Sequence, residues 1–170
     1  MRYENPNSFR TKKLPVLKNI NNNLFNQNNI EETYSTFGQN SSTSKLIKKM
    51  IKVAKDTRKN AFAYRSMHKI WASILMADWT VIWGCNIESV ITWLWTCAER
   101  CAIDNCIANW KYDIMAVCTI DSKFTPTCWA CLQYIMLFSQ LLERDIWIIN
   151  WDVRWHYRIQ PLSELLPNWY

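Results

Sequence analysis

Apolar residues recur every three or four positions in the segment 44–59, and lysines occupy most of the positions between them. The apolar stripe consists of Leu46, Ile47, Met50, Ile51 and Ala54. This spacing is typical of an amphipathic helix that buries one face, and Thr43 or Ser44 is a suitable N-cap. No glycine or proline interrupts the residues that follow, so we expect the helix to continue to Met76.

Two later segments also show helical spacing. The first follows Gly84, takes Asn86 as its cap and runs to Cys101. The second opens on Thr125-Pro126, because proline suits the first turn of a helix, and it runs to about Arg144. The chain has only two glycines in 170 residues. This scarcity favours helices joined by loops over a fold with many tight turns.

From Ile149 to Gln160 the pattern changes to strict alternation of apolar and polar residues. Such alternation predicts a half-buried strand. Its best partner within the chain is the segment 114–120, which would form a parallel β-α-β unit around the helix that opens at Thr125. The alternative is pairing with the same strand of a second copy, which would make a homodimer.

These elements predict a mainly α fold with a minor β element, of the α+β class. Residues 1–43 hold ten asparagines and little apolar surface, so we expect a disordered basic arm there. Residues 44–170 should form a single compact helical domain with a C-terminal strand. All 11 tryptophans and all seven cysteines lie within this second region.

The positive charge of the chain is concentrated in its N-terminal third. Residues 1–60 carry a net charge of +8, whereas the remainder carries −2. A basic region on a near-neutral domain favours a polyanionic partner, above all nucleic acid, although a solubilising tail is the simpler alternative. The residues predicted to contact phosphates are Lys45, Lys48, Lys49, Lys52, Lys55, Arg58 and Lys59.

The N-terminus lacks the apolar region of a signal peptide, and no stretch is apolar enough for a membrane span. We therefore expect an intracellular protein whose cysteines stay reduced.

The cysteines include two closely spaced pairs that suit zinc. Cys97 and Cys101 are four residues apart on one expected helix, so their sulfurs should share a face. Cys128 and Cys131 form a compact second pair, and the two pairs together would complete a site of four thiolates. Further candidates for a place in this site are Cys85, Cys106, Cys118 and His156. The alternative is that the cysteines are small apolar residues of the core.

The segment Cys128-Trp-Ala-Cys131 is also compatible with a redox function. A C-x-x-C motif at a helix start, between two strands, resembles the first part of thioredoxin-like oxidoreductases, in which Cys128 would attack and Cys131 would resolve the mixed disulfide. The chain lacks room for the rest of that fold.

Two pieces of the sequence resemble the small nuclear phosphoprotein of bocaparvoviruses and related parvoviruses. They are Val53-Ala-Lys-Asp56, which leads into an aromatic-containing segment, and Cys128-Trp-Ala-Cys131. The resemblance implies a nuclear, non-enzymatic regulator of viral genome replication and RNA processing.

No P-loop, glycine-rich dinucleotide turn or G-x-S-x-G motif is present, and the chain has only two histidines. We therefore assign no catalytic residue. The predicted function is that of a non-enzymatic accessory protein of viral type that binds nucleic acid. The alternatives are the thioredoxin-like oxidoreductase and an assembly subunit that docks through its tryptophan-rich face.

Overall fold

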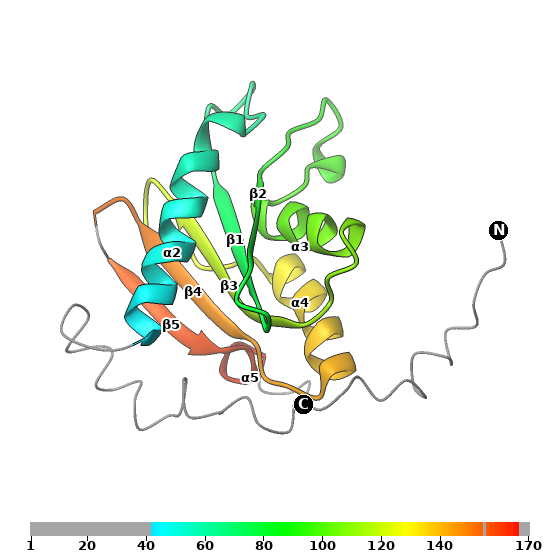
Figure 1. The fold of residues 1–170 in the computed structure, drawn as a ribbon. Helices are drawn as coiled ribbons and strands as arrows, with labels where there is room; N and C mark the ends of the chain where they lie inside the picture. The colour runs from blue at the N-terminus through cyan, green and yellow to red at the C-terminus, as the bar shows by residue number, and fades with distance from the viewer. Residues whose placement is uncertain (1–41, 155, 167–170) are drawn as a thin grey trace, which may run out of the picture. The chain divides into compact units, whose positions relative to one another are not determined.

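The computed structural model describes residues 42–154 and 156–166. Five strands form one mixed sheet in the order β2-β1-β3-β4-β5, in which only β3 and β4 are parallel neighbours. Figure 1 shows the elements, which are α2 (Ser42–Thr57), the 3-10 helix Arg58–Asn60, β1 (Trp71–Met76), β2 (Val81–Cys85), the 3-10 helix Thr92–Leu94, α3 (Ala98–Ala108), β3 (Ile114–Asp121), α4 (Trp129–Leu142), β4 (Trp147–Asp152), β5 (Tyr157–Pro161) and α5 (Leu162–Leu165).

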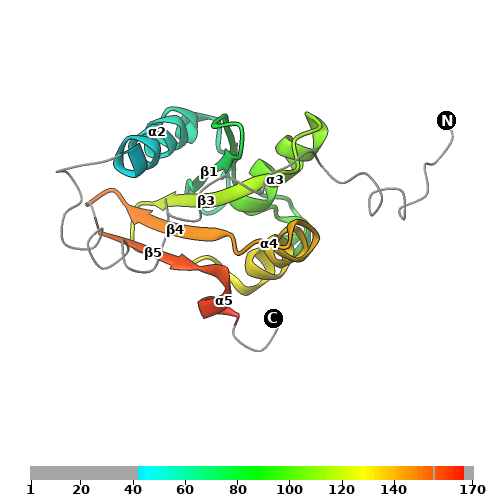
Figure 2. The same cartoon turned by 60° about the horizontal axis from the view of Figure 1, so that its bottom comes forward.

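Helices cover both faces of the sheet. Helix α2 lies on one face, and α3 and α4 lie on the other (Figure 2). Four of the five residues of the apolar stripe of α2 are buried, and Leu46 is half-buried. The hydroxyl of Ser73 in β1 donates a hydrogen bond of 3.0 Å to the carbonyl of Met50 in that helix. On the opposite face, α3 and α4 pack their apolar sides in one cluster with residues of β1, β3 and β4, among them Ile74, Val117 and Ile148. The sheet is therefore the middle of three layers, as in α/β proteins.

The prediction of a mainly α fold is wrong, and its main error lies in the segment 61–76. All six residues of β1 are buried. A strand covered on both faces has no polar face, so it reads as a continuous apolar run without alternation. We took that run for an extension of the preceding helix, which in fact ends at Thr57.

The helix expected between Asn86 and Cys101 is also wrong over most of its length. Helix α3 begins only at Ala98, and the residues before it form a connection with a short 3-10 turn. Apolar residues whose spacing suggested a helix face solvent there, since Val90 is 81% exposed and Leu94 is 59% exposed.

The β-α-β unit is confirmed. Strand β3 pairs in parallel with β4, and α4 connects them. The alternating segment from Ile149 to Gln160 is two strands rather than one, because a turn after Asp152 reverses the chain into β5. The predicted arm falls almost entirely outside the described residues, and the division of the chain at residue 43 stays a prediction.

No helix in the described part of the chain combines the length and the hydrophobicity that crossing a bilayer requires.

Gly84 in β2 allows α3 to lie directly on the sheet. A Cβ atom at this position would come within 2.7 Å of the Cα atom of Ala102 and within 2.8 Å of the carbonyl oxygen of Ala98. Both contacts are with the backbone of α3, which cannot move aside as the end of a flexible side chain could. The absence of a side chain at Gly84 therefore lets α3 lie close against β2.

We predict that Gly84→Ala destabilises the protein by about 2–3 kcal/mol, because the added methyl group must push α3 off the sheet. Urea denaturation measures the free energy of unfolding. Val90→Ala is the control, since a side chain this exposed should change stability by less than about 0.5 kcal/mol. Equal stabilities of Gly84→Ala and the wild type would show that the helix approaches less closely than described.

Candidate metal centre and active site

Three cysteine side chains meet where the N-termini of α3 and α4 come together. Cys97 directly precedes α3, Cys128 directly precedes α4, and Cys131 lies in the first turn of α4. Their Sγ atoms lie within 4.8 Å of one another, and the Sγ atoms of Cys97 and Cys128 are 3.8 Å apart. Cys131 is buried and Cys128 is exposed, so the cluster can be approached from one side.

The spacing of the sulfurs fits a tetrahedral metal ion. Zinc–sulfur bonds of about 2.3 Å place two sulfurs of a tetrahedron about 3.8 Å apart. Within the described residues, the group of possible ligands contains only these three side chains. Three protein ligands with a fourth position left open is the arrangement of catalytic zinc sites, whereas structural sites have four.

The surroundings stabilise a thiolate in the cluster. Hydrogen bonds that join the Cys128 sulfur to Cys131 and Cys97, together with backbone amides of the first turn of α4, put the pKa of Cys128 far below its usual range. The guanidinium group of Arg100 also interacts with the Cys97 sulfur. Thiolates are the form of cysteine that binds metals, so the donor set suits zinc.

A carboxyl group is buried beside the three thiols. Glu99 lies in the first turn of α3 and is only 4% exposed. Burial raises the pKa of Glu99 to about 7, and the carboxyl group also interacts with Cys131. A carboxyl group with a pKa near neutrality can both take up and release a proton. The site therefore combines three side chains that could hold a metal ion with a carboxyl group that can exchange a proton near neutral pH.

Glu99 was not among the residues proposed from the sequence, although a signal for it was present. Cys97 is followed two residues later by an acid, and a C-x-x-C pair comes later in the chain. This order is typical of zinc enzymes that place a general acid and base next to the metal.

The structure brings together three of the four cysteines proposed as metal ligands. Cys101 is not in the group and lies instead near Cys85. The argument for Cys101 assumed that Cys97 is helical, but Cys97 has an extended backbone with φ of −67° and ψ of 155°. The i, i+4 relation between the two sulfurs therefore does not hold.

The other proposed ligands lie elsewhere. Cys106 and Cys118 are fully buried, and burial raises the pKa of each thiol to about 12, as expected for thiols of the core. His156 bonds to Asp152 at the end of β4, with 2.8 Å between Nδ1 and the carboxylate oxygen.

The residues predicted to bind nucleic acid do not lie at the cysteine cluster. The lysines Lys45, Lys48, Lys49, Lys52 and Lys55 are exposed on α2, on the face of the sheet opposite to α3 and α4 (Figure 2), and Arg58 and Lys59 follow in the next turn. Their role stays a prediction.

Comparison with known proteins gives consistent results. No family model matches the chain. The chain is 32% identical, over 121 residues, to a cytidine deaminase of Halalkalibacterium halodurans, which covers 70% of this chain and 89% of that protein. A cytidine deaminase of Sporosarcina psychrophila is 30% identical over 94 residues, or 54% of this chain and 69% of that protein. Among solved structures, a cytidine deaminase from Burkholderia pseudomallei aligns with a TM-score of 0.63 and 27% identity over 71% of this chain and 95% of that one.

These relatives overturn the resemblance to a parvoviral nuclear phosphoprotein, and with it the expected nuclear location and regulatory role. The resemblance depended on two short pieces, one of which, around Cys128, belongs to the metal cluster. The expectation of no enzymatic activity is also wrong. The redox alternative fails as well, because Cys128 and Cys131 share their cluster with a third thiol and the relatives are deaminases. The alternative of a non-enzymatic assembly subunit is wrong for the same reason, because the relatives are enzymes.

We predict that Cys97→Ser strongly reduces metal binding, whereas Cys101→Ser leaves it unchanged. Only Cys97 contributes a sulfur to the cluster, and a hydroxyl is a poor substitute for a thiolate ligand of zinc. Elemental analysis of purified protein gives the metal content per chain. A loss of metal in both variants, or in Cys101→Ser alone, would contradict the ligand set.

Proposed function

The chain belongs to the cytidine deaminase family, and we propose that it is an enzyme that binds Zn²⁺ through Cys97, Cys128 and Cys131 and deaminates cytidine. The observation that carries this proposal is the buried Glu99 carboxyl next to three converging thiols. A structural zinc site has no use for such a group, since a buried carboxyl without a task only costs stability.

Deamination of cytosine replaces its 4-amino group with oxygen from water and releases ammonia. Zn²⁺, when bound, acts as a Lewis acid that makes water nucleophilic enough to attack C4 of the base. The protein supplies the remaining parts of the reaction. The three cysteines would hold the metal at the meeting point of two helix N-termini, and no fourth protein ligand joins them among the described residues.

Glu99 moves the protons. Its carboxylate accepts a proton as water attacks, and the resulting carboxyl group donates a proton to the amino nitrogen so that it leaves as ammonia. Because Glu99 is fixed in the first turn of α3 and shielded from solvent, the proton stays within the site between these two steps.

We predict that Glu99→Gln lowers kcat for cytidine by about a thousandfold or more while the zinc content stays at the wild-type level, because the amide cannot transfer protons. The change in ultraviolet absorbance as cytidine becomes uridine gives the rate. Glu164→Gln, a matched change at an exposed position of α5, should have no effect. Full activity of Glu99→Gln would remove the carboxyl from the mechanism.

Removal of zinc with a chelator should abolish the activity of the wild type, and added Zn²⁺ should restore it, because the metal activates the water. The same assay with metal-depleted protein measures this. Deamination that persists in protein shown to be free of metal would overturn the proposal.

A further inference from the structure

One segment connects the two halves of the cysteine cluster. Residues 61–70 connect the 3-10 helix Arg58–Asn60 to β1. Strand β1 lies between β2 and β3 in the sheet. The connection after β2 leads to Cys97 and Glu99, and the connection after β3 leads to Cys128 and Cys131. The segment 61–70 leads into β1, which separates β2 from β3. It can therefore bind the connection after β2 on one side and the connection after β3 on the other.

On one side, this segment binds the connection after β2. Glu88, which is 4% exposed, accepts a hydrogen bond of 2.8 Å from the backbone amide of Arg65 and another from the hydroxyl of Ser66. The Nδ2 atom of Asn86 donates to the carbonyl of His68 at 2.8 Å, and the Oδ1 atom of Asn86 accepts from the amide of Ile70 at 2.9 Å.

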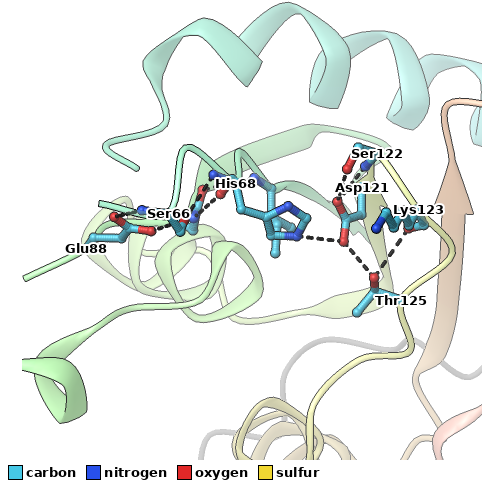
Figure 3. Close-up of polar contacts among 9 residues, drawn as sticks. Ser66, His68, Glu88, Asp121, Ser122, Lys123 and Thr125 are labelled. Atoms are coloured by element: carbon cyan, nitrogen blue, oxygen red, sulfur yellow. Dashed lines mark hydrogen bonds and ion pairs between the residues drawn. The ribbon is translucent and has the colours of Figure 1, made fainter. Parts of the chain in front are cut away.

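On the other side, the segment binds the end of β3 through one side chain. The Nε2 atom of His68 lies 3.0 Å from Oδ2 of Asp121. Figure 3 draws this contact as a dashed line between the two side chains. Oδ2 of Asp121 also accepts a hydrogen bond of 2.7 Å from the hydroxyl of Thr125, and Oδ1 accepts one of 3.1 Å from the hydroxyl of Ser122. Asp121 is only 1% exposed, so these partners compensate the cost of burying its carboxylate.

The hydrogen bonds of Asp121 constrain the metal cluster indirectly, because they hold the backbone that leads to Cys128. Thr125 stands three residues before Cys128, so the carboxylate fixes the start of the connection that ends at this cysteine. A second contact holds the same connection further along, because Nδ2 of Asn150 donates to the hydroxyl of Thr127 at 2.9 Å within the core. Of the side chains described as bonding to the Asp121 carboxylate, His68 comes from a distant part of the chain, whereas Ser122 and Thr125 are local.

We propose that His68 is a positioning residue of the metal site. Its bond to Asp121 ties the connection that carries Cys128 to the segment that is already bound to Asn86 and Glu88, and so sets the distance between Cys128 and the pair Cys97 and Glu99. The catalytic consequence depends on the proposed deaminase function, whereas the consequence for metal affinity does not.

A second histidine–aspartate pair provides a matched control. Asp152 is the neighbour of Asp121 across the parallel strands, is 3% exposed and bonds to His156 at 2.8 Å. Its further side-chain bonds are to the backbone amides of Arg154 and His156. These partners all belong to the turn between β4 and β5, so this pair closes a local turn and connects no distant segments.

The test compares His68→Leu with His156→Leu and His68→Gln. We expect His68→Leu to weaken zinc binding by about tenfold, as substitutions behind metal ligands do, and to lower kcat for cytidine with little change in KM. His156→Leu should leave both near the wild-type values. His68→Gln keeps a donor close to Asp121 and should recover most of the loss. Chelator competition gives the zinc dissociation constant.

Wild-type zinc affinity in His68→Leu would overturn the proposal. An equal loss of affinity in His156→Leu would also overturn it, since that result would indicate a general loosening at the ends of β3 and β4. If His68→Leu fails to fold, Thr125→Val takes its place in the zinc-affinity measurement, because it removes another hydrogen bond of Asp121. Thr125→Ser keeps the hydroxyl group and is its control. A weakened zinc site in the predicted variants, with no deamination of cytidine even by the wild type, would support the positioning role and overturn the proposed function.

Discussion

Three sulfur atoms can share one metal only if the N-termini of two helices meet, and much of the fold serves this requirement. Helix α4 starts at the end of the sheet where β3 and β4 terminate, because it connects two parallel strands. Helix α3 comes from an antiparallel hairpin on the other side of β1, and it reaches the same place because Gly84 lets it lie against the sheet. Neither helix could supply the site alone.

The sequence allowed the part of the fold around α4 to be predicted, because the signals there are local. Proline at the helix start, an apolar strand before it and alternation after it all indicate the same β-α-β unit. The region before α3 gave the opposite result. β1 is buried on both faces and shows no alternation, while the connection before α3 exposes apolar residues whose spacing imitates a helix. In both cases tertiary packing, which a local pattern does not contain, decided the structure.

The three clustered cysteines of the candidate site could be predicted from the sequence, but its carboxyl group could not. Cys97, Cys128 and Cys131 could be proposed because closely spaced cysteines have few other uses in a reduced protein. Cys101 was included because the start of α3 was placed too early. Glu99 was overlooked because nothing in its immediate sequence distinguishes a buried acid from one of the many exposed acids on helices. Only the combination of Cys97, Glu99 and the later C-x-x-C pair carries that information.

The pKa of Glu99 is shifted in the opposite direction to the pKa values of two other buried acids, and this difference distinguishes a structural from a chemical role. Glu88 and Asp152 are both buried, yet hydrogen bonds outweigh the effect of burial and lower the pKa of each. For Glu99, burial is the larger effect and raises the pKa to about 7. Because its folded-state pKa lies above the ordinary value of 4.5, Glu99 favours folding most at low pH, and this contribution is lost as the pH rises through 7. A residue that weakens the fold near neutrality has no structural advantage there, so its position beside the thiols is best explained by the proton that it can exchange.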